Sequence, residues 1–469
     1  MPLFPTLFSA DPTARPLAGF QGAEPLGPSS SLAQPRHLRS KPRSTLAGRR
    51  MTGLIGIDFG TTNSVVSVLA PDGSVQTARF AVGEAAFDVF RTVLCFWKEE
   101  GGGRSSLHHA AGPHAIEAYL DDPGGSRLIM SMKTYLAQRS FTQTNIFGRI
   151  YTLEQMVSLF LRALLGAAHD GARITAGRPV RFAGEFADDT LGEARLRESY
   201  AQAGFPEIDV ALEPEAAGYR FTRSLNAPAT VLVGDFGGGT SDFSLLRFTP
   251  GEPVVSLGHG GVGIAGDTFD YRIIDNAVSP LLGKGGTYSI MGGKDLPVPV
   301  EYFSGFARWH RLSLMRTPKM LRDIEEVARA SADGGPLRNL IALIKDEAGY
   351  EIYQTVSAVK AALSRADSAQ LQFRHEKLAI DRTITRADFE AWIAPDCVRL
   401  ADTVDATLAQ AGITPEQVDR VFLTGGTSFV PAVRRIFAER FGPERVSAGG
   451  EFVSVAEGLA LIGRDRMIA

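Results

Sequence analysis

The chain has 469 residues, of which 44% are apolar, and a formal net charge of −3 at pH 7. No apolar run reaches the ~18 residues that a membrane span needs, and the two cysteines show no metal spacing and suit a reducing compartment. A mildly acidic body argues against a general nucleic-acid binder. We therefore expect a cytoplasmic protein with more than one lobe and with neither a membrane nor a nucleic acid as partner.

Residues 1–50 differ from the rest of the chain. They hold eight prolines and seven basic residues against two acidic ones, with no periodic apolar pattern, so we interpret them as a disordered extension. We favour Met51 as the true start, because the first strand pattern begins at Leu54. A targeting peptide is the alternative for this Arg-rich, acid-poor segment, but its prolines interrupt any amphipathic helix.

The first strong pattern, Leu54 to Ala70, predicts a strand, a tight turn (DFGTTNS) and a second strand. Glycine lets the turn backbone approach a ligand, and successive N–H groups in such a turn form a concave anion site. Asp58 at the strand end suits a hydrated Mg²⁺ beside a polyphosphate, because Mg²⁺ keeps most of its waters and prefers carboxylates. Taken alone, this aspartate also fits an ordinary Asx turn.

Two helices are predicted in the first half of the chain. Thr152 to Ala168 has apolar residues at three- and four-residue spacing, with Thr152 as N-cap and Gln155 as its capping-box partner. Glu213 and Pro214 mark the end of a strand and the start of another helix.

The strand–turn–strand device returns at Thr230 to Phe248, where three glycines form the turn. Acidic residues flank this second turn on both sides, Asp235 before it and Asp242 after it. Two copies of one phosphate-binding hairpin predict two related halves that face each other across a nucleotide.

Helical patterns dominate the second half. Gly266 opens a helix, and the positive end of a helix favours anions. Further helices are predicted to begin at Thr317-Pro318, to run from about Pro336 to Asp367, and to run from Thr385 to about Ala411, where Thr385 and Asp388 form a capping box.

The last part of the chain contains a third glycine turn. Gly425, Gly426 and Thr427 lie between a strand and a helix within Val418 to Phe437. The final apolar stretch predicts a helix that folds back onto the first lobe.

Five stretches, IGIDFGTTNS, GRPVRFAGEF, LEPEAAGY, DFGGGTSDFSLL and LTGGTSFVP, resemble the actin-like ATPase superfamily. Within it the chain resembles the nucleotide-binding domain of the seventy-kilodalton heat-shock chaperones, most closely the short DnaK-like YegD type that lacks the substrate-binding domain. The resemblance runs from about Met51 to the C-terminus. It implies a two-lobed α/β fold of duplicated ribonuclease-H-like domains with a nucleotide cleft between the lobes. We expect lobe I to comprise 51–226 plus 446–469, and lobe II 227–445.

The resemblance and the turn chemistry together imply ATP or ADP with Mg²⁺ as cofactors and assign the site residues. The expected catalytic residues are Asp58, Glu213, Asp235 and Thr240. The expected metal-holding residues are Asp58, Asp235 and Asp242. The expected nucleotide-binding residues are Gly60, Thr61, Thr62, Asn63, Gly237, Gly238, Gly239, Thr240, Gly266, Asp267, Lys360, Ser364, Gly425, Gly426, Thr427 and Phe429.

Two of these assignments have equally plain alternatives. Lys360 and Ser364 share one helix face, which the resemblance places against ribose and adenine, but the residues alone fit an exposed lysine and a neutral small side chain. Phe429 replaces an arginine that stacks on adenine in the family, and its ring fits either stacking or the core.

The chain departs from the family pattern in three ways. The hydrolytic lysine of the family is absent, because Ile116 stands at that position, and Lys133 is the nearest downstream lysine, most simply explained as an exposed helix residue. The adenine-pocket glutamate and arginine are replaced by Ser357 and Ala361. No peptide-binding module or apolar linker is recognisable after the nucleotide domain.

Four functions are compatible with these residues. The first is a chaperone-like protein that binds ATP with Mg²⁺ and hydrolyses it slowly. The second is a nucleotide-responsive binding scaffold with little hydrolysis, suggested by Ile116. The third is a small-molecule kinase of the same superfamily, although no base for a substrate is evident, and the fourth is a filament-forming relative of actin. A protein partner or co-chaperone cannot be named from the sequence.

Overall fold

The computed structural model describes residues 53–468, apart from 71, 83–84, 102–103, 123, 167–171, 185, 223–224, 251, 253, 291–292, 309–314, 347 and 449–453. These residues belong to one compact unit. The expected disordered extension and the expected start at Met51 lie outside the described residues. Among the helices in the described part, none has the length and apolar character needed to cross a membrane.

The first sheet is built around the antiparallel strands β1 (Leu54–Phe59) and β2 (Asn63–Leu69), which the first predicted turn joins. Ile55, Ile57 and Phe59 are fully buried, so strand alternation turns Asp58 toward the opposite face. The strand order is β13-β12-β1-β2-β3, with β6 paired to β2. The other strands of this sheet are β3 (Val75–Thr77), β6 (Phe90–Arg91), β12 (Arg173–Arg178) and β13 (Ile208–Leu212).

The second sheet repeats this plan with the order β16-β15-β14-β21-β22. Strand β14 is antiparallel to β15 and parallel to β21, as β1 is antiparallel to β2 and parallel to β12. The repeated order confirms the two-lobed α/β fold. The strands of this sheet are β14 (Ala229–Phe236), β15 (Ser241–Phe248), β16 (Val255–Val262), β21 (Arg420–Thr424) and β22 (Val446–Ala448).

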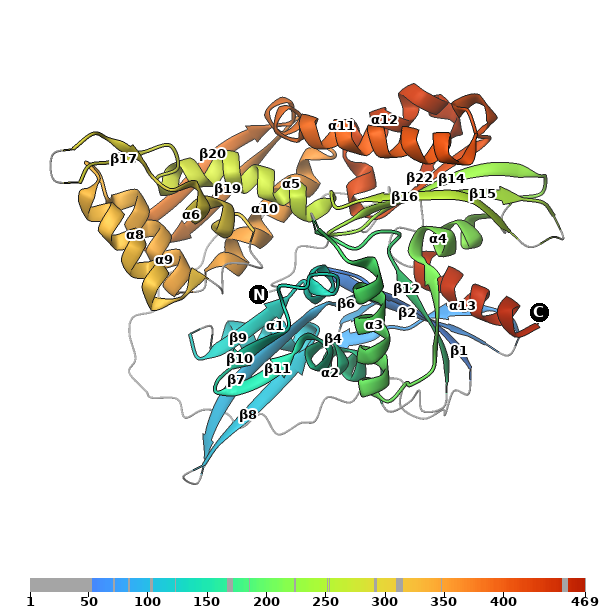
Figure 1. Ribbon diagram of the computed structural model, residues 1–469, viewed down its shortest axis with the longest axis horizontal. Coiled ribbons are helices and arrows are strands. Elements are labelled where there is room, and N and C mark those ends of the chain that lie inside the picture. The colour runs from blue at the N-terminus through green and yellow to red at the C-terminus, as the bar shows by residue number, and fades with distance from the viewer. Residues whose placement is uncertain are drawn as a thin grey trace, which may run out of the picture. The chain divides into compact units, whose positions relative to one another are not determined.

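Two helices, α4 (Glu213–Thr222) and α13 (Ser454–Ile468), pack against each other and join the halves (Figure 1). Helix α4 follows β13 of the first sheet but packs on β14 and β15, whereas α13 follows β22 but packs on β1, β2 and β12. A Cβ on Gly458 would overlap the carbonyl of Ala216, so glycine permits this close crossing. The predicted return of the last helix to the first lobe is confirmed.

The predicted lobe boundaries need one correction. Strand β22 pairs with β21 in the second sheet, so Val446–Ala448 do not belong to the first lobe. The chain returns to the first sheet with α13. The other boundaries stay a prediction.

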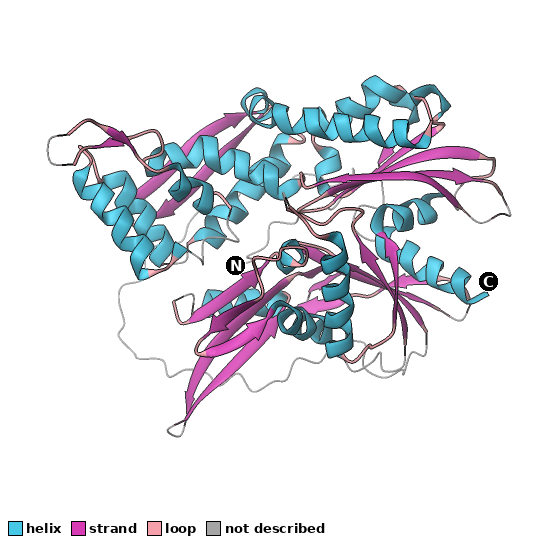
Figure 2. Ribbon diagram, viewed as in Figure 1, coloured by secondary structure: helices cyan, strands magenta, loops and turns pink. Residues whose placement is uncertain are grey.

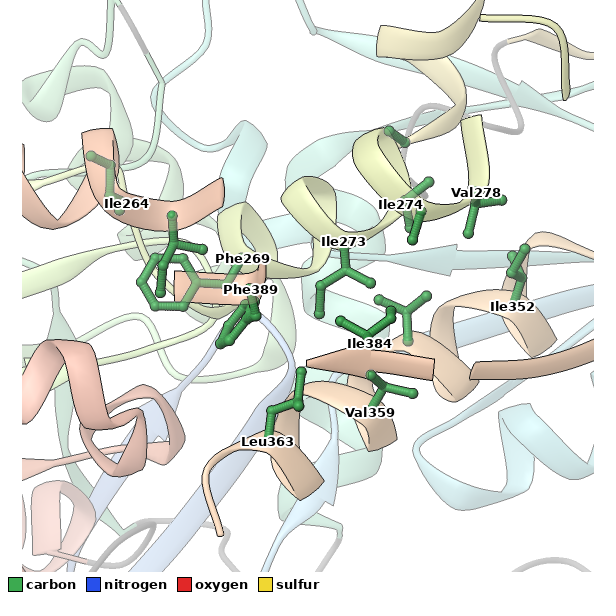
Figure 3. Close-up of a cluster of buried hydrophobic side chains, with 14 of the residues drawn as sticks. Ile264, Phe269, Ile273, Ile274, Val278, Ile352, Val359, Leu363, Ile384 and Phe389 are labelled. Carbon is green, nitrogen blue, oxygen red and sulfur yellow. The ribbon is translucent and has the colours of Figure 1, made fainter. Parts of the chain in front are cut away.

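The outer part of the second lobe has one apolar core, shared by α5 (Gly266–Ile273), α10 (Gly349–Leu363), β20 (Leu378–Thr385) and α11 (Arg386–Ala411). Figure 3 shows Phe269, Ile273, Val359, Ile384 and Phe389 gathered in this core. The core fixes α5 and α10 relative to each other.

The prediction of one helix from Pro336 to Asp367 is wrong. Helix α9 (Gly335–Lys345) ends before α10 begins at Gly349, and α10 ends at Leu363. The Ala348 amide donates to the Leu343 carbonyl at the break. The break lets the apolar faces of both helices reach one core, which a straight helix of that length would not allow.

In the first lobe, a three-stranded sheet of β7 (Val93–Gly101), β8 (Arg104–Ala111) and β9 (Ser126–Met130) carries α1 (Pro113–Asp121). Helix α2 (Leu153–Leu165) has the predicted capping box of Thr152 and Gln155, and α11 has that of Thr385 and Asp388. Helix α3 (Asp189–Ala203) packs on α2.

Figure 2 distinguishes the helices from the strands. The remaining described elements are β4 (Phe80–Val82), β5 (Ala85–Phe87), β10 (Gln143–Ile146), β11 (Arg149–Thr152), β17 (Thr287–Tyr288), β18 (Leu296–Pro297), β19 (Ser368–His375), α6 (Val300–Phe306), α8 (Pro318–Ala330), α12 (Pro431–Phe441), and the short turns η1 (Met132–Tyr135), η3 (Ile274–Val278), η4 (Ser279–Leu282), η5 (Pro415–Gln417), η6 (Gly426–Phe429) and η7 (Pro443–Arg445).

Candidate functional site

The two hairpin turns meet each other. A Cβ on Gly238 would lie 2.6 Å from Thr62 Oγ1, and one on Gly239 would lie 3.3 Å from Thr61 Oγ1. Side chains in the second turn would therefore collide with the threonines of the first. The glycines keep the turns close enough for both to reach one ligand.

One aspartate lies beside each turn. Asp58, near the end of β1, has a pKa well above its usual range, because the surrounding protein desolvates it and the Glu213 carboxylate repels its charge. Burial, followed by repulsion from Glu213 and Asp242, raises the pKa of Asp235, near the end of β14, to about 8. The predicted pair of aspartates thus shares one electrostatic environment with Glu213.

Lys133 is the unexpected member of this site. Its Nζ donates to Glu213 Oε1 at 2.5 Å, and both side chains are buried. Burial lowers the pKa of Lys133, but Glu213 and Asp58 outweigh that effect and raise it above its usual value. The interpretation of Lys133 as an exposed helix residue is therefore wrong.

Asp242 of the second lobe accepts a hydrogen bond from the first lobe at this site. The Arg181 backbone N–H, which follows β12, donates to Asp242 Oδ1 at 3.1 Å. Burial and then Glu213 raise the pKa of Asp242 to about 7, against the hydrogen bonds from Thr240 and Arg181. The predicted metal residue thus lies in the same cluster.

These residues fit a hydrated divalent cation. Four carboxylates, Asp58, Glu213, Asp235 and Asp242, interact with a single ammonium, that of Lys133. The excess negative charge would be offset by a cation. Mg²⁺ prefers carboxylate neighbours and keeps several of its waters, so this donor set would fit Mg²⁺ held through its waters.

The start of α5 lies against the second turn. The Asp267 amide donates to the Gly238 carbonyl at 2.8 Å, and the Gly266 amide lies 3.4 Å from the Gly237 carbonyl. The amides of two residues expected to bind the nucleotide are therefore engaged with the turn in this conformation.

Lys360 is tied to α5 rather than extended. Its Nζ donates to Asp270 Oδ2 at 2.8 Å and to the Gly266 carbonyl at 3.1 Å. Ser364 caps α10 and donates to the Lys360 carbonyl. Both residues lie on the predicted helix, and Lys360 borders the glycine turn.

The third glycine turn also meets this region. Gly425 has φ +84°, and a Cβ there would overlap the Phe236 carbonyl, so this position requires glycine. A Cβ on Gly266 would lie 3.4 Å from Thr427 Oγ1. Gly426 and Phe429 lie in η6, where Phe429 is half-buried.

Arg91 is a residue of this site that the sequence did not predict. Its Nη1 donates to Asn63 Oδ1 at 3.0 Å, and its charge lowers the pKa of Asp267, although burial and Asp270 raise that pKa overall to about 7. Arg91 thus interacts with two predicted nucleotide-binding residues, Asn63 of the first lobe and Asp267 of the second. Only the pairing of β6 with β2 brings Arg91 to the turn, and no local sequence signal marks it.

Ile116 has a structural role. It packs against a cluster of Val93, Cys95, Ala115, Tyr119 and Tyr350. Tyr350 comes from α10, whereas the other members come from β7 and α1. The position expected to correspond to the lysine of the family therefore belongs to an apolar contact between the lobes.

Comparison with known proteins finds similarity to one group of proteins, the Hsp70-type chaperones. The model of the family described as Hsp70 protein matches residues 339–464. The chaperone protein DnaK of Thermus thermophilus is 26% identical over 419 residues, covering 84% of this chain and 58% of that protein. The chaperone protein HscA homolog of Bordetella petrii is 26% identical over 429 residues, covering 86% and 57%. DnaK of Thermotoga petrophila is 25% identical over 410 residues, covering 87% and 58%.

The chain thus spans somewhat more than half the length of these relatives. Similarity over more than four-fifths of the chain agrees with the family-model match and with the duplicated sheets. The chain is thus similar to proteins of the Hsp70 family, and its duplicated sheets have the two-lobed actin-like ATPase fold.

Proposed function

We propose that this chain binds ATP with Mg²⁺ between its two hairpin turns and hydrolyses it slowly. The observation that carries the proposal is the buried Lys133–Glu213 pair beside Asp58 and Asp235, where the glycine turns of both lobes meet. Phosphoryl transfer needs positioning and charge compensation more than covalent chemistry, and this cluster offers both.

Each residue of the cluster has a role in this proposal. Asp58 and Asp235 orient the attacking water and hold the hydrated Mg²⁺, with Asp242 beside them. Glu213 accepts a hydrogen bond from the water or holds Lys133 in place. When bound, Mg²⁺ would offset the charges of the phosphates. Backbone amides of the turns and the Thr61, Thr62 and Thr240 hydroxyls would bind phosphate oxygens.

The biological context is also a proposal. The relatives are named as chaperone proteins, which supports a chaperone-like role for this chain, and its motifs favour the YegD type. The cytoplasmic location stays a prediction from the two cysteines of the sequence. Ile116 favours a second candidate, a nucleotide-responsive scaffold that binds ATP but hardly hydrolyses it. Both candidates require nucleotide binding.

One experiment separates the candidates. Thermal unfolding of the full chain is recorded with Mg²⁺ and ATP, with Mg²⁺ and ADP, or with neither, while phosphate release is followed in parallel. A nucleotide at 100 times its Kd should add ~2.7 kcal/mol of stability. Stabilisation with turnover supports the ATPase, and stabilisation without turnover supports the scaffold.

Two variants sharpen this experiment. Asp235→Ala should abolish turnover while the chain stays folded, and the exposed Asp121→Ala should behave like the wild type. Unchanged turnover in Asp235→Ala would refute the role of Asp235. The absence of any nucleotide effect on unfolding would refute both candidates.

A further inference from the structure

The Lys133 ammonium has more hydrogen-bond donors than protein acceptors. An ammonium group carries three hydrogens, and in the described part of the chain its one recorded hydrogen bond goes to Glu213. The side chain is 9% exposed, so bulk water is a poor substitute. A buried cation with unused donors is unfavourable unless another acceptor is supplied.

The backbone around Lys133 is fixed rather than free to swing. Arg195 on α3 lies within hydrogen-bond distance of the carbonyls of Tyr135, Leu136 and Gln138 and pairs with Glu154 of α2 at 3.1 Å. These contacts hold η1 and the segment after it against two helices. Lys133 therefore presents its ammonium from a rigid support.

The segment also borders the second phosphate turn. A Cβ on Gly239 would lie 3.6 Å from Thr134 Oγ1 and 3.3 Å from Thr61 Oγ1. The residue next to Lys133 thus contacts the place where both hairpins meet. The carboxylates of Asp58 in the first lobe and Asp242 in the second both raise the pKa of Lys133, so its ammonium is near charged groups of both hairpins.

We propose that Lys133 contacts the terminal phosphate of the bound nucleotide and supplies the positive charge that the residue at position 116 cannot supply. This assignment rests on the proposed function. In hydrolysis, a bond forms between the water oxygen and the terminal phosphorus, and the bond to ADP breaks. The water proton passes to a carboxylate of the cluster, while Lys133 keeps its protons and offsets charge on the phosphoryl oxygens.

The test is a loss of turnover followed by chemical rescue. Lys133→Ala should lower turnover by on the order of 100-fold, as the loss of one transition-state donor does, while Mg²⁺–ADP still shifts thermal unfolding. Ethylammonium should restore at least ~10-fold of this loss by entering the space that the lysine leaves. Ethanol, a neutral molecule of similar size, should restore nothing, and the exposed Lys319→Ala is the matched control.

A second variant covers the case that Lys133→Ala does not fold, since breaking a buried pair leaves an uncompensated charge. Lys133→Arg keeps the charge but replaces a compact ammonium by a larger planar group. We expect it to fold, to bind Mg²⁺–ADP and to lose at least ~10-fold of turnover, because the larger group displaces the phosphate. Wild-type turnover in this variant would overturn the direct contact, because that contact depends on the compact shape of the ammonium.

The outcomes distinguish this assignment from the proposed function. A turnover rate of Lys133→Ala within threefold of the wild-type rate would overturn the role of Lys133 and leave the proposed function intact. Rescue by ethanol as strong as that by ethylammonium also overturns it, because the space and not the charge would then matter. A wild-type chain with neither nucleotide stabilisation nor turnover overturns the proposed function itself.

Discussion

The rings of Tyr119 in α1 and Tyr350 in α10 meet edge to face, with their centroids 5.9 Å apart. Both side chains are almost fully buried, although one belongs to each half of the fold. The Tyr350 hydroxyl accepts from Gln354 at 2.6 Å, and the Arg91 charge opposes the rise in the Tyr350 pKa that burial causes. This contact closes the two halves over the region where Asn63 and Asp267 lie.

Removal of this contact should speed nucleotide release. Tyr350→Ala should lower stability by ~2–4 kcal/mol through the cavity it leaves and should raise the dissociation rate of a fluorescent ADP several-fold, because opening no longer exposes the buried ring. Stopped-flow displacement by excess ATP measures the rate. Tyr350→Phe keeps the ring and is the control. Equal dissociation rates in Tyr350→Ala and wild type would contradict a closing role.

The buried ion pair should respond asymmetrically to mutation. Glu213→Gln weakens one hydrogen bond but leaves Asp58 and Asp242 to compensate the Lys133 charge, so it should cost only ~1–3 kcal/mol of unfolding free energy. Lys133→Met leaves the carboxylates without a cation and should cost ~3–5 kcal/mol, and the double variant Lys133→Met/Glu213→Gln should be more stable than Lys133→Met alone. Urea unfolding of the four proteins in this cycle measures the coupling. Additive losses would show that the two side chains do not depend on each other.

Because the two turns approach each other closely, substitution of Gly238 should weaken nucleotide binding. Gly238→Ala introduces a Cβ 2.6 Å from Thr62 Oγ1, so the turns must separate and nucleotide stabilisation should fall by at least ~1.4 kcal/mol, a tenfold loss of affinity. Thermal unfolding with Mg²⁺–ADP measures it. The control is Gly124→Ala, because a Cβ on Gly124 would meet no atom within 4 Å. An equal effect of the two variants would contradict the prediction.

Stability should depend on pH through Asp267. Burial and then the Asp270 charge raise its pKa to about 7, although Lys360, Tyr353 and Arg91 oppose this. Because the folded state holds this proton more tightly than the unfolded state, the contribution is most favourable below pH ~4 and is lost as the pH rises to about 7. Asp267→Asn should therefore raise stability at pH 8 by ~1–2 kcal/mol and reduce the slope of the pH profile, to which Asp235 and Asp242 also contribute.

Urea unfolding between pH 4.5 and 8 checks this prediction. The exposed Asp121→Asn is the control and should leave the wild-type slope unchanged. A slope in Asp267→Asn as steep as that of the wild type would contradict the role of Asp267.

The sequence by itself determined the local elements. The two hairpins, the caps at Thr152 and Thr385 and the glycine at position 425 depend on turn geometry and on neighbours within a few residues, and the structure has them as expected. The repeated hairpin also indicated the duplicated fold, because each copy needs the same sheet around it.

Only the tertiary structure decided which distant residues complete the site. Lys133, Arg91 and Tyr350 reach it through packing between elements that lie far apart in the chain, and no short-range pattern encodes such contacts. The break between α9 and α10 has the same origin, since burial of two apolar faces in one core outweighed a locally helical pattern. Burial likewise set the charge state of the cluster, because desolvation and neighbouring charges depend on the folded surroundings.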